Sequence, residues 1–239
     1  KTMIKTIRVM LIPNNKQKTK LFQYANTARF AYNWALGREQ ENYKNGGKFI
    51  SDGDLRKEFT QLKKTDAYAW LNNVSNNVTK QAIKDACEAY RDFFKGYTKF
   101  PRFKSKKYSI PKFYQDNVKI QFTDTHVKVE GFATSKKKNK QKLNWIRLAE
   151  HGRIPTDCKY CNPRFKYDGL NWWITVGIDY EDSTTLSSNE GIGIDLGVKD
   201  LAICSDKHKY QNINKTQKIK KLEKRKRRLQ RSISRKYEK

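Results

Sequence analysis

Residues 3–13 read Met3-Ile4-Lys5-Thr6-Ile7-Arg8-Val9-Met10-Leu11-Ile12-Pro13, and they set the first expectation for the architecture. Ile7, Val9 and Leu11 alternate with Thr6, Arg8 and Met10, and a period of two residues is typical of a half-buried strand. Pro13 ends the pattern. A lone strand would leave both of its edges unpaired, so we expect this strand to pair with strands that come later in the chain.

Residues from about 16 to 95 predict a block of helices. The first helix is indicated by apolar residues at spacings of four, three, four and three, which form one stripe: Leu21, Ala25, Ala28, Tyr32 and Ala35. A second, shorter helix follows Ser51, whose hydroxyl can cap its first turn. A third helix ends near Gly96 and has the apolar series Val78, Ala82, Ala86, Ala89 and Phe93.

Beyond Gly96 short alternating stretches return, and they predict strands at 118–122, 127–129 and 172–178. The expected fold class is therefore α+β, a small barrel interrupted by the helical block. A polar linker at 181–189, a strand pair at 191–195 and 198–204, and a Lys/Arg-dense helix from Lys215 follow. The expected domains are residues 1–14 for the first barrel strand, 15–96 for the helices, 97–182 for the rest of the barrel and 183–239 for a second domain.

The charge balance indicates a polyanionic partner. The 239 residues include 52 Lys and Arg against 24 Asp and Glu, which gives a net charge of +28 and favours binding to nucleic acid. With 36% hydrophobic and 13% aromatic residues, the chain is not a disordered basic tail. Neither an apolar run long enough for a bilayer nor a signal peptide occurs, and four cysteines suit a reducing compartment. We therefore expect a cytoplasmic, nucleoid-associated protein without a membrane partner.

Three basic stretches are candidates for contact with nucleic acid. In residues 96–108, cations can contact phosphates, while interleaved aromatic rings can stack on bases or simply anchor the loop. The candidates there are Tyr97, Lys99, Arg102, Lys104, Lys106 and Lys107. The other two stretches, which also fit a solvated surface, contribute Lys136, Lys137 and Lys138 between strands and Lys224, Arg225 and Arg228 in the last helix.

The segment Gly193-Ile194-Asp195-Leu196-Gly197 carries the sharpest chemical signal. Asp195 ends an apolar strand, and a buried strand seldom tolerates an unpaired charge, so this carboxylate is expected to bind a cation. RNase H-like nucleases use such a residue as a metal ligand, whereas sugar-kinase and actin-like ATPases use an Asp-x-Gly hairpin for nucleotide phosphates; the net charge favours the nuclease. A turn carboxylate with no ligand is the alternative. Cys158 and Cys161 have no second cysteine pair, so zinc is not expected.

Taken in order, the motifs resemble the TnpB family of transposon-encoded OrfB-type proteins, relatives of compact type V CRISPR effectors. The resemblance rests on residues 30–35, 78–86, 100–104, 172–176 and 193–199. It implies an RNA-guided DNA endonuclease with an OB-like wedge barrel, an inserted helical recognition block and the start of a RuvC (RNase H-like) domain. The implied partners are guide RNA and target double-stranded DNA, and the implied cofactor is Mg²⁺ with Asp195 as one ligand. Thr79, Lys80 and Gln81 are implied to approach the short motif that flanks the target.

The chain departs from the family pattern in one respect. Family members carry two further acidic RuvC motifs and a zinc ribbon downstream of the basic helix, and none is present in these 239 residues. Asp195 alone cannot hold two ions about 3.5–4 Å apart, so this chain by itself is not expected to cut DNA. A cleavage-dead, RNA-guided repressor, a general basic RNA-binding protein and a sugar-kinase-like ATPase stay open as alternatives, as does a homodimer.

Overall fold

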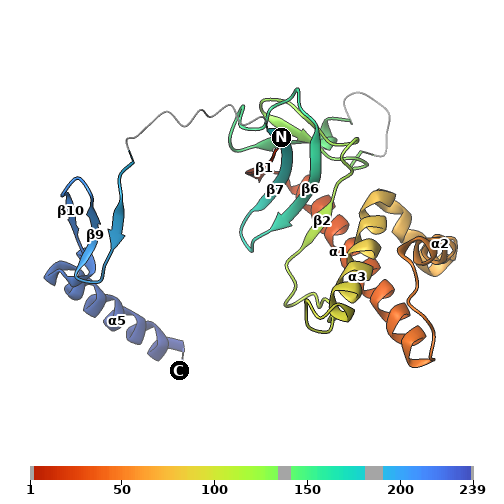
Figure 1. Cartoon of the computed structure of the whole chain (residues 1–239), viewed down its shortest axis with the longest axis horizontal. Coiled ribbons are helices and arrows are strands. Elements are labelled where there is room, and N and C mark those ends of the chain that lie inside the picture. The colour runs from red at the N-terminus through yellow and green to blue at the C-terminus, as the bar shows by residue number, and fades with distance from the viewer. Residues whose placement is uncertain (1–2, 134–140, 181–190, 238–239) are drawn as a thin grey trace. The chain divides into compact units, whose positions relative to one another are not determined.

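The computed structural model describes residues 3–133, 141–180 and 191–237. The chain forms two compact units, Lys1–Asp182 and Ser183–Lys239, and each is considered by itself. The first unit combines a seven-stranded sheet with the helices α1, α2 and α3, and the second combines a three-stranded sheet with the helix α5 (Figure 1). Both sheets are antiparallel throughout their described pairs, so the chain has a mixed α/β architecture built on a large antiparallel sheet.

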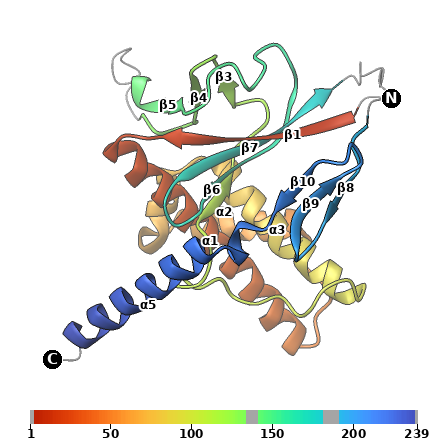
Figure 2. The same cartoon turned by 90° about the vertical axis from the view of Figure 1, so that its left-hand side faces the viewer.

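The first strand lies in the middle of the large sheet. The strands are β1 (Met3–Ile12), β2 (Lys112–Tyr114), β3 (Gln121–Phe122), β4 (His126–Lys128), β5 (Trp145–Leu148), β6 (Tyr160–Tyr167) and β7 (Trp172–Tyr180). They follow the order β2-β6-β7-β1-β5-β4-β3. Strand β1 pairs with β7 from Met3↔Tyr180 to Leu11↔Trp172 and meets β5 at Leu11↔Leu148 (Figure 2). The expected pairing of β1 with later strands is confirmed, and the helices are an insertion into the sheet.

Helix α1 (Asn15–Lys44) begins with a reciprocal cap that also joins it to the sheet. The Asn14 side chain accepts from the Gln17 backbone N–H at 2.9 Å, and the Gln17 side chain accepts from the Asn14 N–H at 3.0 Å. The Gln17 amide then donates to the carbonyls of Leu143 and Trp145 at 3.1 and 2.7 Å. The predicted apolar stripe of α1 is buried, as expected.

The other two helices of this unit begin at serine caps. Helix α2 (Asp52–Leu62) follows Ser51, a short 3₁₀ helix η1 (Asp66–Asn73) comes next, and α3 (Asn76–Phe94) follows Ser75. The Ser75 hydroxyl donates to a carboxylate oxygen of Glu130 at 2.8 Å, so the start of α3 is fixed to the sheet side of the unit.

One continuous core joins the sheet to the helices. Its large, fully buried side chains include Trp172, Tyr24, Phe132 and Phe165. Phe113 of β2 stacks on Phe165 of β6, with ring centroids 4.9 Å apart, and Tyr24 of α1 meets Phe113 edge-on at 5.3 Å. Burying each such ring contributes about 2–3 kcal/mol, so these contacts fix the helices against the sheet.

The second unit contains β8 (Ile194–Leu196), β9 (Asp200–Cys204), β10 (Lys209–Gln211), the 3₁₀ helix η3 (Ile213–Lys215) and α5 (Gln217–Tyr237). The sheet order is β10-β9-β8, with Asp195 opposite Ile203. The predicted strand pair and basic helix are therefore present. The described part of the chain includes no helix that is both long enough and apolar enough to cross a membrane.

The predicted strand over 118–122 is wrong for most of its length. Only Gln121 and Phe122 are in a strand, and Val118 is 85% exposed in a turn. The Asp116 carboxylate accepts from the Val118 backbone N–H at 3.0 Å, which is the Asx-turn geometry that competes with a strand. The strands β2, β5 and β6 and the helix η1 carry no periodic signal strong enough to have been predicted.

Candidate nucleic-acid interface

The lysine-rich loop of residues 97–108 starts at a helix end that its sequence specifies. Gly96 has a φ of +75°, its N–H donates to Phe93, and the Tyr97 N–H donates to Asp92. This is the Schellman arrangement, in which glycine takes the left-handed conformation that other residues avoid. The loop therefore leaves the end of α3 in a defined direction and returns along the helices to β2 (Figure 1).

The loop presents cations and rings to solvent together. Tyr97 and Tyr108 are 76% and 81% exposed. The exposed cations are Lys99, Arg102, Lys106 and Lys107. Among the described residues none of these four cations forms an ion pair, so each can exchange water for a phosphate. Cations without an ion-pair partner can contact the phosphate backbone of a single strand, and exposed aromatic rings can stack on its bases.

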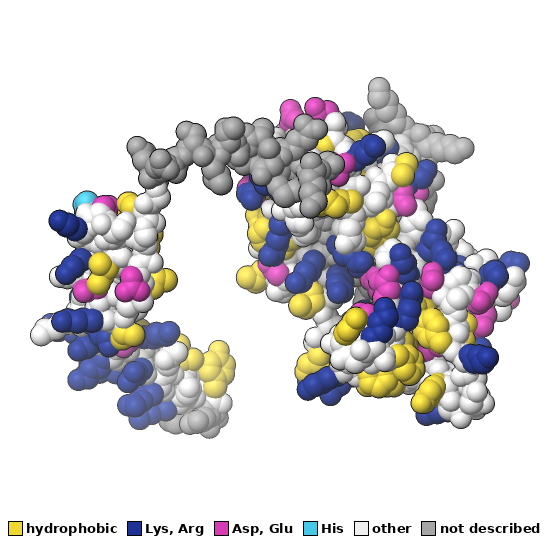
Figure 3. Space-filling model, viewed as in Figure 1, with side chains coloured by type: hydrophobic (Ala, Val, Ile, Leu, Met, Phe, Trp, Pro, Cys, Tyr) yellow, Lys and Arg dark blue, Asp and Glu magenta, His cyan; other side chains and the backbone are white. Residues whose placement is uncertain are grey.

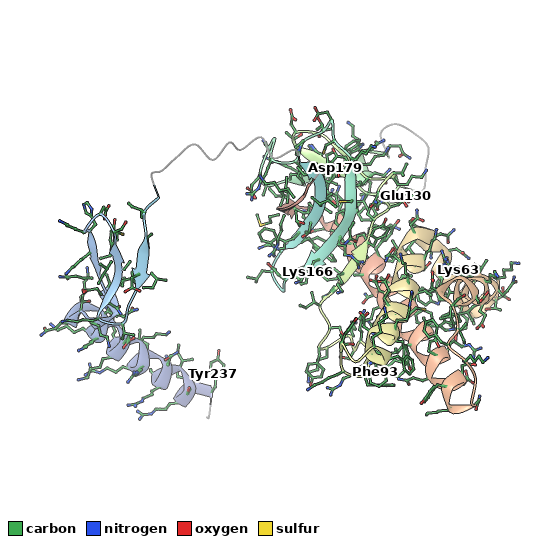
Figure 4. All side chains as sticks on the ribbon, in the orientation of Figure 1. Lys63, Phe93, Glu130, Lys166, Asp179 and Tyr237 are labelled. Carbon is green, nitrogen blue, oxygen red and sulfur yellow. The ribbon has the colours of Figure 1, made fainter. Side chains whose placement is uncertain are left out.

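Phe100 has a different role, because its ring anchors the loop. It meets Tyr90 edge-on at 5.7 Å and Phe93 edge-on at 5.1 Å, both on α3. Phe93 lies at the far end of α3 from the sheet (Figure 4). The loop's aromatic residues were expected either to anchor the loop or to stack on bases. Phe100 anchors it, whereas the exposed Tyr97 and Tyr108 remain available for stacking.

The middle of the loop is pinned to α1 by a contact that the sequence did not reveal. The Asn33 side chain accepts from the Lys104 backbone N–H at 2.8 Å and donates to the Lys104 carbonyl at 2.9 Å. The Lys104 ammonium lies over the Tyr32 ring, 3.0 Å from its centroid. Burial lowers the pKa of Lys104 to about 8, helped by the neighbouring charge of Lys112. Lys104 is thus held inward, unlike the other cations of the loop.

On α3, the side chains of Thr79, Lys80 and Gln81 differ in exposure and in hydrogen bonding. Thr79 is 3% exposed and its hydroxyl donates to the Asn76 carbonyl at 3.1 Å. The Gln81 amide donates to Asp85 at 2.9 Å. Lys80 is exposed, so among these three it is Lys80 whose side chain can reach a partner directly.

Beside Lys80 lies a groove with a cavity volume of about 670 Å³. Its basic lining residues are Arg56, Lys63, Lys64 and Lys80. Lys63, labelled in Figure 4, donates from its ammonium to the Asn76 amide oxygen at 2.6 Å, and burial lowers the pKa of this lysine. Arg56, Lys63 and Lys64 come from α2 and the turn after it, and no local pattern in the sequence singled them out.

Asp85 on α3 joins the helices to the sheet through an ion pair. Arg164 on β6 donates to both Asp85 oxygens, at 2.7 and 3.1 Å. Burial alone would raise the pKa of the Asp85 carboxyl, but the hydrogen bonds from Arg164 and Gln81 outweigh it and hold this pKa below its usual value. The bidentate geometry fixes the distance between α3 and β6.

In the second unit, the expectation that Asp195 belongs to a buried strand is wrong. All three residues of β8 are exposed, including Asp195. Asp195 forms no ion pair among the described side chains. Asp206, which is near in sequence, instead pairs with His208 at 3.1 Å.

The residues present around Asp195 do not fit a two-metal centre. Within residues 3–133, 141–180 and 191–237 there is no group of three His, Cys, Asp or Glu side chains that could hold a metal ion. Two-metal phosphodiester cleavage needs several carboxylates on ions about 3.5–4 Å apart. A single exposed carboxylate cannot hold such a pair of ions, so the described residues by themselves support no step of that reaction.

The helix α5 presents most of the cations of the second unit. Lys224, Arg225 and Arg228 are exposed, and dark-blue side chains follow the helix (Figure 3). One face of α5 is nevertheless apolar and exposed, with Leu222 and Leu229 seven residues apart. The basic stretch Lys136, Lys137 and Lys138 lies outside the described residues.

Comparisons with known proteins agree with the motif series. A family model described as a helix-turn-helix domain, HTH_OrfB_IS605, matches residues 3–48. In this chain those residues form β1 and the single long helix α1. The chain is also 27% identical to the protein named "Putative RNA-guided DNA endonuclease InsQ" of Escherichia coli (strain K12). The alignment spans 234 residues, which cover 98% of this chain and 54% of that protein.

A second relative is named "Putative RNA-guided DNA endonuclease", from Streptomyces pristinaespiralis. It is 24% identical over 200 residues, which is 84% of this chain and 48% of the relative. The chain thus spans about half the length of these curated relatives. A solved structure, "Cryo-EM structure of the Cas12f1-sgRNA-target DNA complex", aligns over 95% of this chain and 62% of its own with 14% identity and a TM-score of 0.34. The sequence matches agree with the resemblance carried by the ordered motifs: the chain is similar to OrfB-type proteins and to relatives named as RNA-guided DNA endonucleases.

Proposed function

We propose that this chain is the RNA- and DNA-binding part of a TnpB-type, RNA-guided DNA endonuclease. In this proposal the sheet of the first unit is an OB-like wedge barrel that holds the guide RNA. The helical block follows the guide–target duplex, and Lys80 with the basic groove beside it approaches the target-flanking motif. Base pairing with the guide would choose the sequence, while the protein would recognise backbone and shape.

The loop of residues 97–108 carries this proposal. It offers exposed rings beside cations that have no carboxylate partner among the described residues, and its position is fixed by Gly96, Phe100 and Asn33. Pre-positioned, unpaired cations contact a phosphate backbone without first breaking an ion pair. The proposal takes a guide RNA and a DNA target as partners because both curated relatives are named as RNA-guided DNA endonucleases.

The test is binding of the noncoding RNA transcribed beside the gene, measured by gel shift against a length-matched scrambled RNA. We expect one discrete complex that the scrambled RNA displaces poorly. The loop variant Lys99→Met, Arg102→Met and Lys106→Met should reduce the slope of log K against log salt by about 2, since each phosphate contact on a single strand contributes about 0.7.

A matched control removes three exposed cations from α1, with Lys16→Met, Lys18→Met and Lys44→Met. Its charge change equals that of the loop variant, so non-specific electrostatics would lower both slopes alike. Equal losses in the two variants would contradict the interface. Equal affinity for the scrambled RNA would favour a general RNA-binding protein instead of a guided one.

We further propose that residues 191–204 begin a RuvC-type domain in which Asp195 is one Mg²⁺ ligand. The support is the segment Gly193-Ile194-Asp195-Leu196-Gly197, placed on β8 and the turn toward β9. Catalysis would need more carboxylates than the described residues bring together. Cleavage by the intact gene product with its RNA should be lost in Asp195→Ala, and unchanged cleavage would remove Asp195 from the metal site.

A further inference from the structure

A cavity lies between α1, α3 and the segment that leads from the loop into β2, apart from the groove beside Lys80. Its volume is about 370 Å³, within the range of sites that hold small ligands. Five of its lining residues are cations, against one carboxylate: Arg29, Lys104, Lys106, Lys112, Arg164 and Asp85. The only acidic lining group is already engaged by Arg164 and Gln81, so the free charge that faces the cavity is positive.

Two of these cations carry a donor that no carboxylate engages, although Arg29 also donates from Nη1 to the Lys104 carbonyl at 3.4 Å. Among the described residues the Lys104 ammonium has no ion pair, and it lies against the face of the Tyr32 ring. The Nε atom of Arg29 is buried with no hydrogen-bond acceptor among the described residues. Leaving a buried N–H such as the Arg29 Nε–H unsatisfied costs about 1–3 kcal/mol. Such groups fit a site whose anionic ligand supplies the missing acceptors.

Apart from Asn26, Ser109 and Tyr114, the rest of the cavity wall is apolar and partly aromatic. Phe22 and Tyr32 come from α1, and Phe113 comes from β2. Tyr32 and Phe113 belong to the packed core and Phe22 packs against it, so their rings are held in place by neighbours. A cationic end beside an apolar wall with aromatic rings matches a phosphate joined to a planar heterocycle.

We propose that this cavity binds one unstacked nucleotide of the bound nucleic acid. Its phosphate would lie on Lys104 and Arg29, and its base would lie against the ring-lined wall. The inference rests on the proposed nucleic-acid function and adds a site for a single nucleotide to it. Unstacking one base costs a few kcal/mol, least in a single-stranded segment, so the nucleotide would come from such a segment.

The probes for the test are the four nucleoside 5′-monophosphates, ribose 5-phosphate and inorganic phosphate, each titrated by calorimetry into the full chain freed of nucleic acid. At least one monophosphate should bind at a ratio of one to one. Ribose 5-phosphate should bind about tenfold more weakly, because contact of a base with aromatic rings contributes about 1–3 kcal/mol.

Two variants and one control localise the binding. Lys104→Met keeps an unbranched apolar side chain of similar length but removes the charge, and Arg29→Met removes the second cation. Each should weaken the monophosphate about tenfold or more, the usual effect of losing one charged hydrogen bond. Lys159→Met removes an exposed cation outside the cavity and should leave the affinity within about twofold.

Three outcomes would overturn the inference. One is that no monophosphate saturates the wild-type protein, and another is that inorganic phosphate binds as well as the monophosphates. The third is that a bound single-stranded oligonucleotide fails to displace the monophosphate, which would make the cavity a site for free nucleotide. RNA gel shifts on the same preparations separate the two proposals, because RNA binding can persist when the cavity stays empty.

Discussion

Replacing Lys104 by Met is expected to stabilise the folded protein at neutral pH, although it removes a charge from the candidate interface. The Lys104 ammonium is largely desolvated, has no ion-pair partner among the described residues, and lies over the Tyr32 ring. Methionine can fill the same volume without a charge to desolvate. The variant should therefore gain free energy of unfolding where most core substitutions lose it.

The pKa of Lys104 sets the size of this gain. A fall from the usual 10.5 to about 8 corresponds to ~3 kcal/mol, at about 1.4 kcal/mol for each pH unit. Partial exposure of the side chain and the attraction of the ring reduce the net effect, the latter by about 1–2 kcal/mol. We expect the variant to be more stable by about 1–2 kcal/mol at pH 7, or about 2–8 °C in Tm for a unit of this size.

The pH dependence provides the sharper measurement. Below pH 8 Lys104 is protonated in both states, and the folded protein carries the full cost of the buried charge. Between about pH 8 and 10.5 the unfolded chain binds more protons than the folded one, so the free energy of unfolding of the wild type gains a rising contribution. Lys104→Met lacks this contribution. Urea titrations followed by tryptophan fluorescence at pH 7 and pH 10 should show the two proteins converging.

Lys159→Met serves as the control, since it removes an exposed lysine and should change stability by no more than about 0.5 kcal/mol. A Lys104→Met variant less stable than the wild type at pH 7 would show that the buried Lys104 charge does not destabilise the fold. A stability gap between the two proteins that stays constant from pH 7 to pH 10 would show the same.

Three further changes have defined expected outcomes. Asp85→Asn should lower the free energy of unfolding, measured in urea at pH 7, by about 1–3 kcal/mol. Because the pKa of Asp85 is depressed in the folded state, its stabilising contribution is present above the usual pKa of 3.8 and is lost as pH falls through the folded value. A stability difference between variant and wild type that is as large at pH 3 as at pH 7 would contradict this. Asn14→Ala removes the cap of α1 and should cost about 1 kcal/mol in thermal unfolding, and no loss would exclude a stabilising cap. Replacing Lys224, Arg225 and Arg228 by Gln should reduce the salt slope of RNA binding by about 2–3, whereas an unchanged slope would place α5 away from the RNA.

The elements that could be predicted are those whose signal is local. The alternation in β1 and the stripe along α1 report burial on one side of a single element, and a cap such as Ser51 depends on a side chain and a backbone group three residues apart. The lysine-rich loop could also be predicted, because its charge and aromatic content can be counted in the sequence without knowing the fold. These features indicate the architecture of the first unit and its main candidate surface.

The rest depends on partners that are distant in sequence. Asn33 and Lys104 are 71 residues apart, and Asp85 and Arg164 are 79 apart, so no window of sequence joins them. The exposure of Asp195 could not be predicted either, because an apolar strand is buried only if another layer covers it. At Val118 the apolar alternation predicted a strand, but the structure has a turn in which the Asp116 side chain accepts from the Val118 backbone N–H.

The central place of β1 has a consequence for biosynthesis. Its main neighbour, β7, is paired from Met3↔Tyr180 to Leu11↔Trp172, so the ribosome must complete the intervening helices and strands before β1 has its partner. At about 5–20 residues per second, β1 leaves the exit tunnel and waits on the order of ten seconds with two unsatisfied edges. The helices, whose contacts are local, can form during that delay. Nascent chains are therefore expected to need protection of this first strand, and slowing translation would lengthen the period in which it can aggregate.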